Sequence, residues 1–155
     1  MGHYVATVAW KRGEQVFTDG KYSRGHRWRF DGGVDIPASS SPLVVKPPLS
    51  DESAVDPEEG FIASLASCHM LFFIDFARRG GFRIDSYEDQ AEGVLAKDAE
   101  GRMAMTLVTL HPNVAFSGDK TPSADEIAQL HHKAHEACFI ANSVKSEVRI
   151  EPQSP

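Results

Sequence analysis

The sequence predicts an α+β fold with two helices and several antiparallel strands in a single domain over residues 1–155. The signal Asp56-Pro57-Glu58-Glu59 opens a long apolar segment, and Ser123-Ala124-Asp125-Glu126 opens a second helical segment. In both signals, a capping side chain is followed three residues later by a glutamate, the pattern of a capping box. The segments around the two helices are β-branched or alternate in polarity, as strands do. A chain of 155 residues has the usual size of one domain.

Three stretches near the N-terminus favour strands. Residues 4–10 are rich in β-branched and aromatic side chains, residues 15–18 lead into an Asp-Gly turn signal, and residues 26–30 alternate basic with aromatic side chains. Residues 31–55 contain Gly-Gly, a serine run and Pro-Pro, which predicts a long loop.

The first helix is expected to run from Pro57 to Arg79 and to end at Gly80-Gly81. Its side chains are apolar or small on nearly every face, which indicates burial on all sides. A helix of this length spans about 34 Å, more than the rest of so small a chain easily encloses. The sequence therefore predicts a second subunit that covers part of this central helix.

The rest of the chain is expected to complete the α+β pattern. Residues 83–116 favour strands, two of them joined by a turn at residues 97–101. The second helix places Ile127, Leu130 and Ala134 on one face, and residues 145–151 favour a final strand.

The composition excludes several classes of protein. Sixteen Lys and Arg against 22 Asp and Glu give a net charge of −6, which argues against a nucleic-acid partner. The sequence shows neither about 18 uninterrupted apolar residues nor a signal-peptide layout, so we expect a cytoplasmic protein without a membrane partner. Two cysteines are too few for the disulfide framework of a small secreted protein.

The two cysteines have two interpretations. Composition alone favours an inert core role, since free cysteines are among the most buried residues. Cys68 would then belong to an apolar stripe of the first helix, which contains Phe61, Leu65, Cys68, Phe72 and Phe76. A reactive cysteine instead requires a nearby cation, and His69 points about 100° away around the helix.

Glu58 precedes Cys68 by ten residues, which corresponds to about 15 Å along one helix. The two side chains therefore share a site only if an antiparallel copy of the helix supplies the carboxylate or the helix start bends. The alternative is that Glu58 is an exposed first-turn acid that favours the helix dipole.

A candidate metal-binding cluster lies on the second helix. His131, His135 and Cys138 are spaced i, i+4 and i+7, so all three could face one metal ion. Three ligands with an open fourth position suit a catalytic zinc. The alternative is a solvated, histidine-bearing helix face.

Two segments resemble the OsmC/Ohr family, the osmotically inducible and organic hydroperoxide resistance proteins. The segment Asp56–His69 is similar to the family's central helix, where a Pro-Glu pair precedes the reactive cysteine by this same interval. The segment Ala134–Cys138, followed by Asn142, is similar to the family's second-cysteine segment. The order of strands and helices also fits, and Cys68-His69 looks more like the OsmC or OsmC-like branch than the Ohr branch.

This resemblance implies an OsmC-like fold that forms an intertwined homodimer with two sites at the subunit interface. By residue-by-residue similarity, Cys68 is the peroxidatic thiolate, Cys138 is the resolving cysteine and Glu58 orients an activating arginine. Arg12 looks most like that arginine, and Arg24 is the second choice.

The implied activity is that of a peroxiredoxin-like thiol peroxidase, which reduces organic hydroperoxides in oxidative stress defence. Cys68 would become a sulfenic acid, and Cys138 would condense with it to a disulfide. An external dithiol, by family analogy a lipoylated protein, would reduce that disulfide, and no bound cofactor is expected. The alternative is a non-enzymatic OsmC-like protein whose dimer pocket binds a small apolar or electrophilic ligand. Gly60 and Phe139 depart from the family pattern, which has a larger apolar residue and a proline there.

Overall fold

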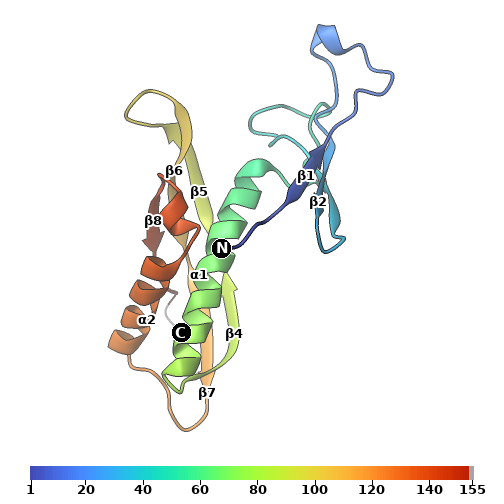
Figure 1. Cartoon of the computed structure of the whole chain (residues 1–155). Coiled ribbons are helices and arrows are strands. Elements are labelled where there is room, and N and C mark those ends of the chain that lie inside the picture. The colour runs from blue at the N-terminus through green and yellow to red at the C-terminus, as the bar shows by residue number, and fades with distance from the viewer. Residues whose placement is uncertain (154–155) are drawn as a thin grey trace. The chain divides into compact units, whose positions relative to one another are not determined.

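The structure is a computed structural model that describes residues 1–153 and divides into two compact units. The N-terminal unit is Met1–Gly60 and the C-terminal unit is Phe61–Pro155. Helix α1 (Pro57–Arg79) begins in the first unit and continues through the second (Figure 1). With this division into two units, one domain over residues 1–155 stays a prediction.

The N-terminal unit contains an antiparallel sheet in the order β1-β2-β3. Its strands are β1 (Ala6–Ala9), β2 (His26–Phe30) and β3 (Asp35–Ala38). Strand β3 lies inside the segment expected to be a loop, so that expectation is wrong for these four residues. Gly33 (φ 88°) allows the return, and its N–H donates to the Phe30 carbonyl at 3.0 Å.

The strand expected at residues 15–18 is also wrong, because a short 3₁₀ helix, η1 (Phe17–Asp19), occupies this region. Local side-chain hydrogen bonds compete with strand pairing here. Gln15 Nε2 donates to the Arg12 carbonyl at 2.8 Å, and Asp19 Oδ1 accepts the Lys21 N–H at 2.9 Å.

Both predicted capping boxes are present. Asp56 Oδ1 accepts the Glu59 N–H at 2.8 Å, and Glu59 Oε2 accepts the Asp56 N–H at 3.0 Å. Ser123 and Glu126 make the same pair of bonds at the start of α2 (Ala124–Ala137). These reciprocal bonds satisfy amides that the first helical turn leaves without partners.

Within the single chain, helix α1 buries one stripe of side chains. Its fully buried residues recur at steps of four: Leu65, His69, Phe73 and Ala77. This stripe is rotated by one residue from the predicted one, and Leu71 is 64% exposed. By length and composition alone, α1 could cross a membrane. Its buried stripe is what a core helix requires.

The C-terminal unit holds two sheets and two helices (Figure 1). One sheet pairs β4 (Arg83–Asp89) with β7 (Pro112–Ser117), antiparallel. The other has the order β5-β6-β8, from β5 (Glu92–Lys97), β6 (Met103–Leu110) and β8 (Glu147–Ile150). The β5–β6 hairpin is confirmed, whereas β8 runs parallel to β6 because its connection passes through α2.

Two apolar clusters form the core of the C-terminal unit. The first joins α1, through Phe73 and Ala77, to α2, through Leu130 and Ala134. The second joins Leu65 of α1 to two residues of β6, Val108 and Leu110. Packing thus fixes α1, which carries Cys68, and α2, which ends next to Cys138.

Candidate active site

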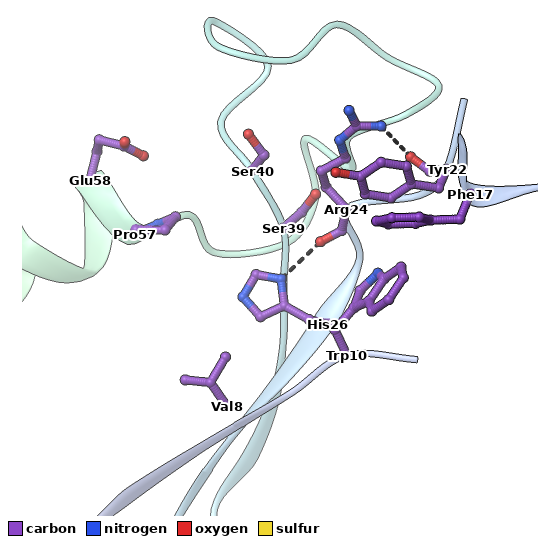
Figure 2. A pocket seen from close by; sticks show the side chains of 10 residues that line it. All are labelled: Val8, Trp10, Phe17, Tyr22, Arg24, His26, Ser39, Ser40, Pro57 and Glu58. Carbon is purple, nitrogen blue, oxygen red and sulfur yellow. Dashed lines mark hydrogen bonds between the residues drawn. The ribbon is translucent and has the colours of Figure 1, made fainter. Parts of the chain in front are cut away.

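A pocket of about 490 Å³ lies within the N-terminal unit. The sheet, the loops that follow its strands and the first turn of α1 supply its lining (Figure 2). The lining residues are Val8, Trp10, Phe17, Tyr22, Arg24, His26, Ser39, Ser40, Pro57 and Glu58.

Three aromatic rings form the apolar wall of this pocket. The ring centroids of Trp10 and Phe17 are 5.8 Å apart, those of Trp10 and Tyr22 are 5.6 Å apart, and those of Phe17 and Tyr22 are 4.7 Å apart. Trp10 Nε1 also donates to the Ser23 carbonyl at 2.9 Å. These spacings are typical of stabilising aromatic contacts. Sequence reasoning missed this wall, because its members come from separate short segments.

Arg24 lines the same pocket and is held on one side. Its Nη1 donates to the Gly20 carbonyl at 3.0 Å and to the Tyr22 carbonyl, and its guanidinium lies 3.8 Å from the Tyr22 ring centroid. Among the described residues, the other guanidinium nitrogens make no hydrogen bond. They remain available to an anion, which a guanidinium binds well.

The structure places Glu58 and Arg24 on one pocket, whereas Arg12 lies outside its lining (Figure 2). Arg12 Nη1 donates to the Gln15 carbonyl at 2.6 Å in an exposed loop. In residues 1–153, no ion pair joins Glu58 to Arg24. Of the two arginines that the sequence offered, only the second choice shares a cavity with Glu58.

In the C-terminal unit, the side chains of Cys68 and Cys138 are neighbours. Both are free thiols; Cys68 is half-buried and Cys138 is fully buried. Burial, together with the hydrogen bond to Cys68 and the charge of Cys68, raises the pKa of Cys138 to about 11. Cys138 Sγ also accepts the Ala141 N–H at 3.3 Å.

A buried histidine pair joins α1, which carries Cys68, to α2, which ends next to Cys138. His69 Nε2 is 3.1 Å from His131 Nδ1, and the two rings stack with an interplanar angle of 7°. Phe73 covers the other side of His131, with ring centroids 4.2 Å apart. Burial, with the charges of His131 and His135, lowers the pKa of His69 to about 4, and burial lowers that of His131 to about 4. Both imidazoles are therefore neutral at pH 7.

The expectation of a solvated face is wrong for His131, which is only 4% exposed. The available signal was its position between Ile127, Leu130 and Ala134, which places it on the apolar side of α2. The zinc alternative also loses its basis: within residues 1–153, no three His, Cys, Asp or Glu side chains are arranged to hold a metal ion.

Comparison with known proteins shows the family of this chain. The family model of the OsmC-like proteins matches residues 50–153. The chain belongs to the OsmC-like family. This OsmC-like chain is 49% identical to an OsmC-like protein of unknown function from Vibrio cholerae, with a TM-score of 0.97 and coverage of 99% of this chain and 100% of the other. No curated protein matches it.

More distant structures share the fold of this OsmC-like protein. An organic hydroperoxide resistance protein from Elizabethkingia anophelis gives a TM-score of 0.74 at 16% identity, covering 100% of this chain and 98% of the other. One from Bacillus subtilis gives 0.65 at 22% identity, covering 97% and 98%. The α+β OsmC-like fold is thus confirmed, and some of the structures that share it belong to proteins named for organic hydroperoxide resistance.

Proposed function

We propose that this protein is a thiol-dependent peroxidase that reduces organic hydroperoxides, with Cys68 as the peroxidatic and Cys138 as the resolving cysteine. The observation that carries the proposal is the adjacency of these two free thiols, one on α1 and the other at the C-cap of α2. Membership of a family that includes hydroperoxide resistance proteins supports the same reaction.

The reaction proceeds in two steps within the protein. The Cys68 thiolate attacks the distal oxygen of the hydroperoxide, the O–O bond breaks, and the departing alkoxide takes a proton and leaves as the alcohol. Cys68 is then a sulfenic acid. The Cys138 sulfur attacks the Cys68 sulfur, the S–O bond breaks, and the hydroxyl leaves with the Cys138 proton as water. The product is a disulfide between the two residues.

The environment of Cys138 suits a resolving role. Its raised pKa keeps the proton on this sulfur until the sulfenic acid has formed. A thiol that donates a hydrogen bond to a neighbouring thiolate also stabilises the negative charge there. Cys138 thus supports the nucleophile first and supplies a proton for the departing water afterwards.

Arg24 and Glu58 are proposed to complete the site in the assembled dimer. A guanidinium beside the sulfur favours the thiolate and stabilises charge as the O–O bond breaks. Arg24 is preferred over Arg12 because Arg24 lines a pocket with Glu58 and has unused donors. Glu58 is then the carboxylate that orients the guanidinium.

The homodimer is part of the proposal. Large apolar side chains are exposed in both units of a single chain, more than scattered surface residues explain. Val8, Phe17, Leu71, Met103 and Phe139 are among these exposed side chains. A partner subunit would cover these side chains and the open faces of α1.

Turnover requires electrons from outside the chain. Both cysteines are consumed in the disulfide, and the sequence contains no third cysteine. We therefore propose an external dithiol, such as the lipoyl group of a carrier protein, which reduces the disulfide by thiol exchange. A cytoplasmic location would supply such reductants.

A second candidate is a binding protein without catalysis. The aromatic wall of Trp10, Phe17 and Tyr22 favours a small apolar ligand, since such pockets are mostly apolar with a few polar groups. A purified protein that retains an apolar ligand and leaves peroxide unreduced would favour this function.

The test is consumption of cumene hydroperoxide with dihydrolipoamide as the electron donor. Wild-type protein is expected to form one alcohol per dithiol oxidised, and Cys68→Ser is expected to lose this activity. Ser67→Ala, at the neighbouring exposed position on α1, is the matched control and is expected to retain it. Unchanged activity of Cys68→Ser would refute the proposal.

A further inference from the structure

The imidazole of His26 is fixed at both of its nitrogens. Trp28 Nε1 donates to His26 Nε2 at 3.0 Å. Figure 2 shows the second contact, in which His26 Nδ1 lies 2.8 Å from the Arg24 carbonyl oxygen. An indole N–H only donates, so Nε2 must be the accepting, unprotonated nitrogen. Nδ1 then carries the hydrogen and donates it to the Arg24 carbonyl. The two bonds together select one neutral tautomer of His26.

The ring of Trp28 also lies against the first turn of α1. A Cβ atom at Gly60 would stand 2.6 Å from Trp28 Cη2 and 2.7 Å from Cζ3. Real Cβ atoms do not approach a ring this closely, so the contact requires glycine. Gly60 follows Glu58 by two residues, in the turn that presents Glu58 to the pocket. The departure from the family pattern at Gly60 is thus explained by Trp28.

We propose that His26 and Trp28 are positioning residues, a brace that sets the Arg24 backbone against the helical turn that carries Glu58. This inference rests on the proposed function, in which Arg24 and Glu58 act as a pair. The brace runs from the Arg24 carbonyl through His26 and Trp28 to Gly60, entirely within the N-terminal unit. Neither brace residue needs to touch the reacting atoms.

The backbone N–H of Arg24 donates to the Leu49 carbonyl at 2.8 Å, which ties Arg24 to another loop but not to α1. Arg24 follows a loop, and the contacts of its side chain with Gly20 and Tyr22 come from that same loop. They orient the guanidinium within the loop but do not connect it to α1. The His26–Trp28 brace supplies that connection, and catalytic rates fall steeply when a charged group is misplaced by about 1 Å.

The side chains of β2 alternate between its two faces, and the brace residues lie on only one of them. His26 and Trp28 are half-buried on one side, whereas Arg27 and Arg29 are exposed on the other. Both arginines pair with Asp35 of β3, at 2.8 Å and 3.2 Å. Variants on the brace side can therefore be compared with a sheet whose outer ion pairs are intact.

The first test needs no enzymatic activity. Nitrogen-15 NMR of the histidine side chains in the wild-type protein is expected to show His26 as the Nδ1–H tautomer, assigned by its loss in His26→Asn. A spectrum with the hydrogen on Nε2 would overturn the brace, because Trp28 could then not donate to that nitrogen.

The second test measures kcat/KM for cumene hydroperoxide. Trp28→Phe keeps the ring against Gly60 and removes the N–H donor, and His26→Leu removes both bonds; each is expected to lose about tenfold. His26→Asn keeps a donor near the Arg24 carbonyl and is expected to lose less kcat/KM than His26→Leu. His3→Asn, an exposed histidine outside the pocket, is the matched control.

The outcomes separate the brace from the proposed function. If the wild-type protein reduces no hydroperoxide, the proposed function fails, and the tautomer measurement still decides whether the brace exists. If the wild type is active and Trp28→Phe and His26→Leu both retain full kcat/KM, the brace is refuted and the peroxidase stands. Equal losses in His26→Asn and His26→Leu would likewise overturn the role of the Arg24 carbonyl bond.

Discussion

Acidification from pH 7 to pH 5 is expected to destabilise this protein through two buried imidazoles, His69 and His131. Both pKa values fall from an ordinary 6.5 to about 4, because burial penalises the charged ring and, for His69, neighbouring histidines add to it. Below about pH 6.5, the unfolded chain takes up protons that the folded chain does not bind. The free energy of unfolding therefore falls as the pH falls, until the folded-state pKa is reached near pH 4.

The size of the effect follows from these pKa values. Each tenfold difference in proton affinity is worth about 1.4 kcal/mol. Between pH 7 and pH 5, each imidazole lowers the free energy of unfolding by about 1.8 kcal/mol, and the pair by about 3 to 4 kcal/mol. Carboxylates with lowered pKa values, such as Asp98 and Glu126, act only below their ordinary values near 4. Between pH 7 and pH 5, the change in the free energy of unfolding is therefore expected to come mainly from the two histidines.

Urea unfolding at several pH values between 7 and 5, at one protein concentration, measures the slope of the free energy of unfolding against pH. The double variant His69→Leu/His131→Leu replaces both members of the hydrogen-bonded pair and is expected to flatten it. His132→Leu changes a histidine whose side chain is 72% exposed and is expected to keep the wild-type slope. A wild-type stability that does not change between pH 7 and pH 5, or a double variant with the wild-type slope, would refute the reasoning.

Three further predictions concern other residues. Gly60→Ala is expected to lower the free energy of unfolding by about 1–3 kcal/mol, because the new Cβ meets the Trp28 ring; urea denaturation checks it, and a stability equal to wild type would contradict the contact. Ser123→Ala removes a helix cap and is expected to cost about 1 kcal/mol in the same assay, whereas Ser123→Asp keeps it. Cys138→Ser is expected to accumulate a sulfenic acid at Cys68 after peroxide treatment, detected as a dimedone adduct by mass spectrometry; an adduct no more abundant than in wild type would argue against resolution by Cys138.

Local signals in the sequence were sufficient for the helices. The capping boxes at Asp56 and Ser123 depend on side chains three residues apart, and both are present. The β5–β6 hairpin was equally readable from its alternating polarity and its turn. Strand β3 was missed, because its pairing with β2 depends on a turn at Gly33 within a segment rich in loop-forming residues.

The sequence predicted the candidate site only where residues close together along the chain define the motif. The interval between Glu58 and Cys68 and the second-cysteine segment indicated the family, which the comparisons confirm. The choice between Arg12 and Arg24 depends on how a loop folds back over a sheet, which spacing does not encode. The burial of His131 likewise depends on its partner 62 residues earlier in the chain.

The most direct test of the central claim is peptide mapping after treatment of the reduced wild-type protein with one equivalent of cumene hydroperoxide. The account predicts one molecule of alcohol per chain and a single new peptide pair linked by a Cys68–Cys138 disulfide. Both cysteines recovered as free thiols with the peroxide unconsumed would contradict it.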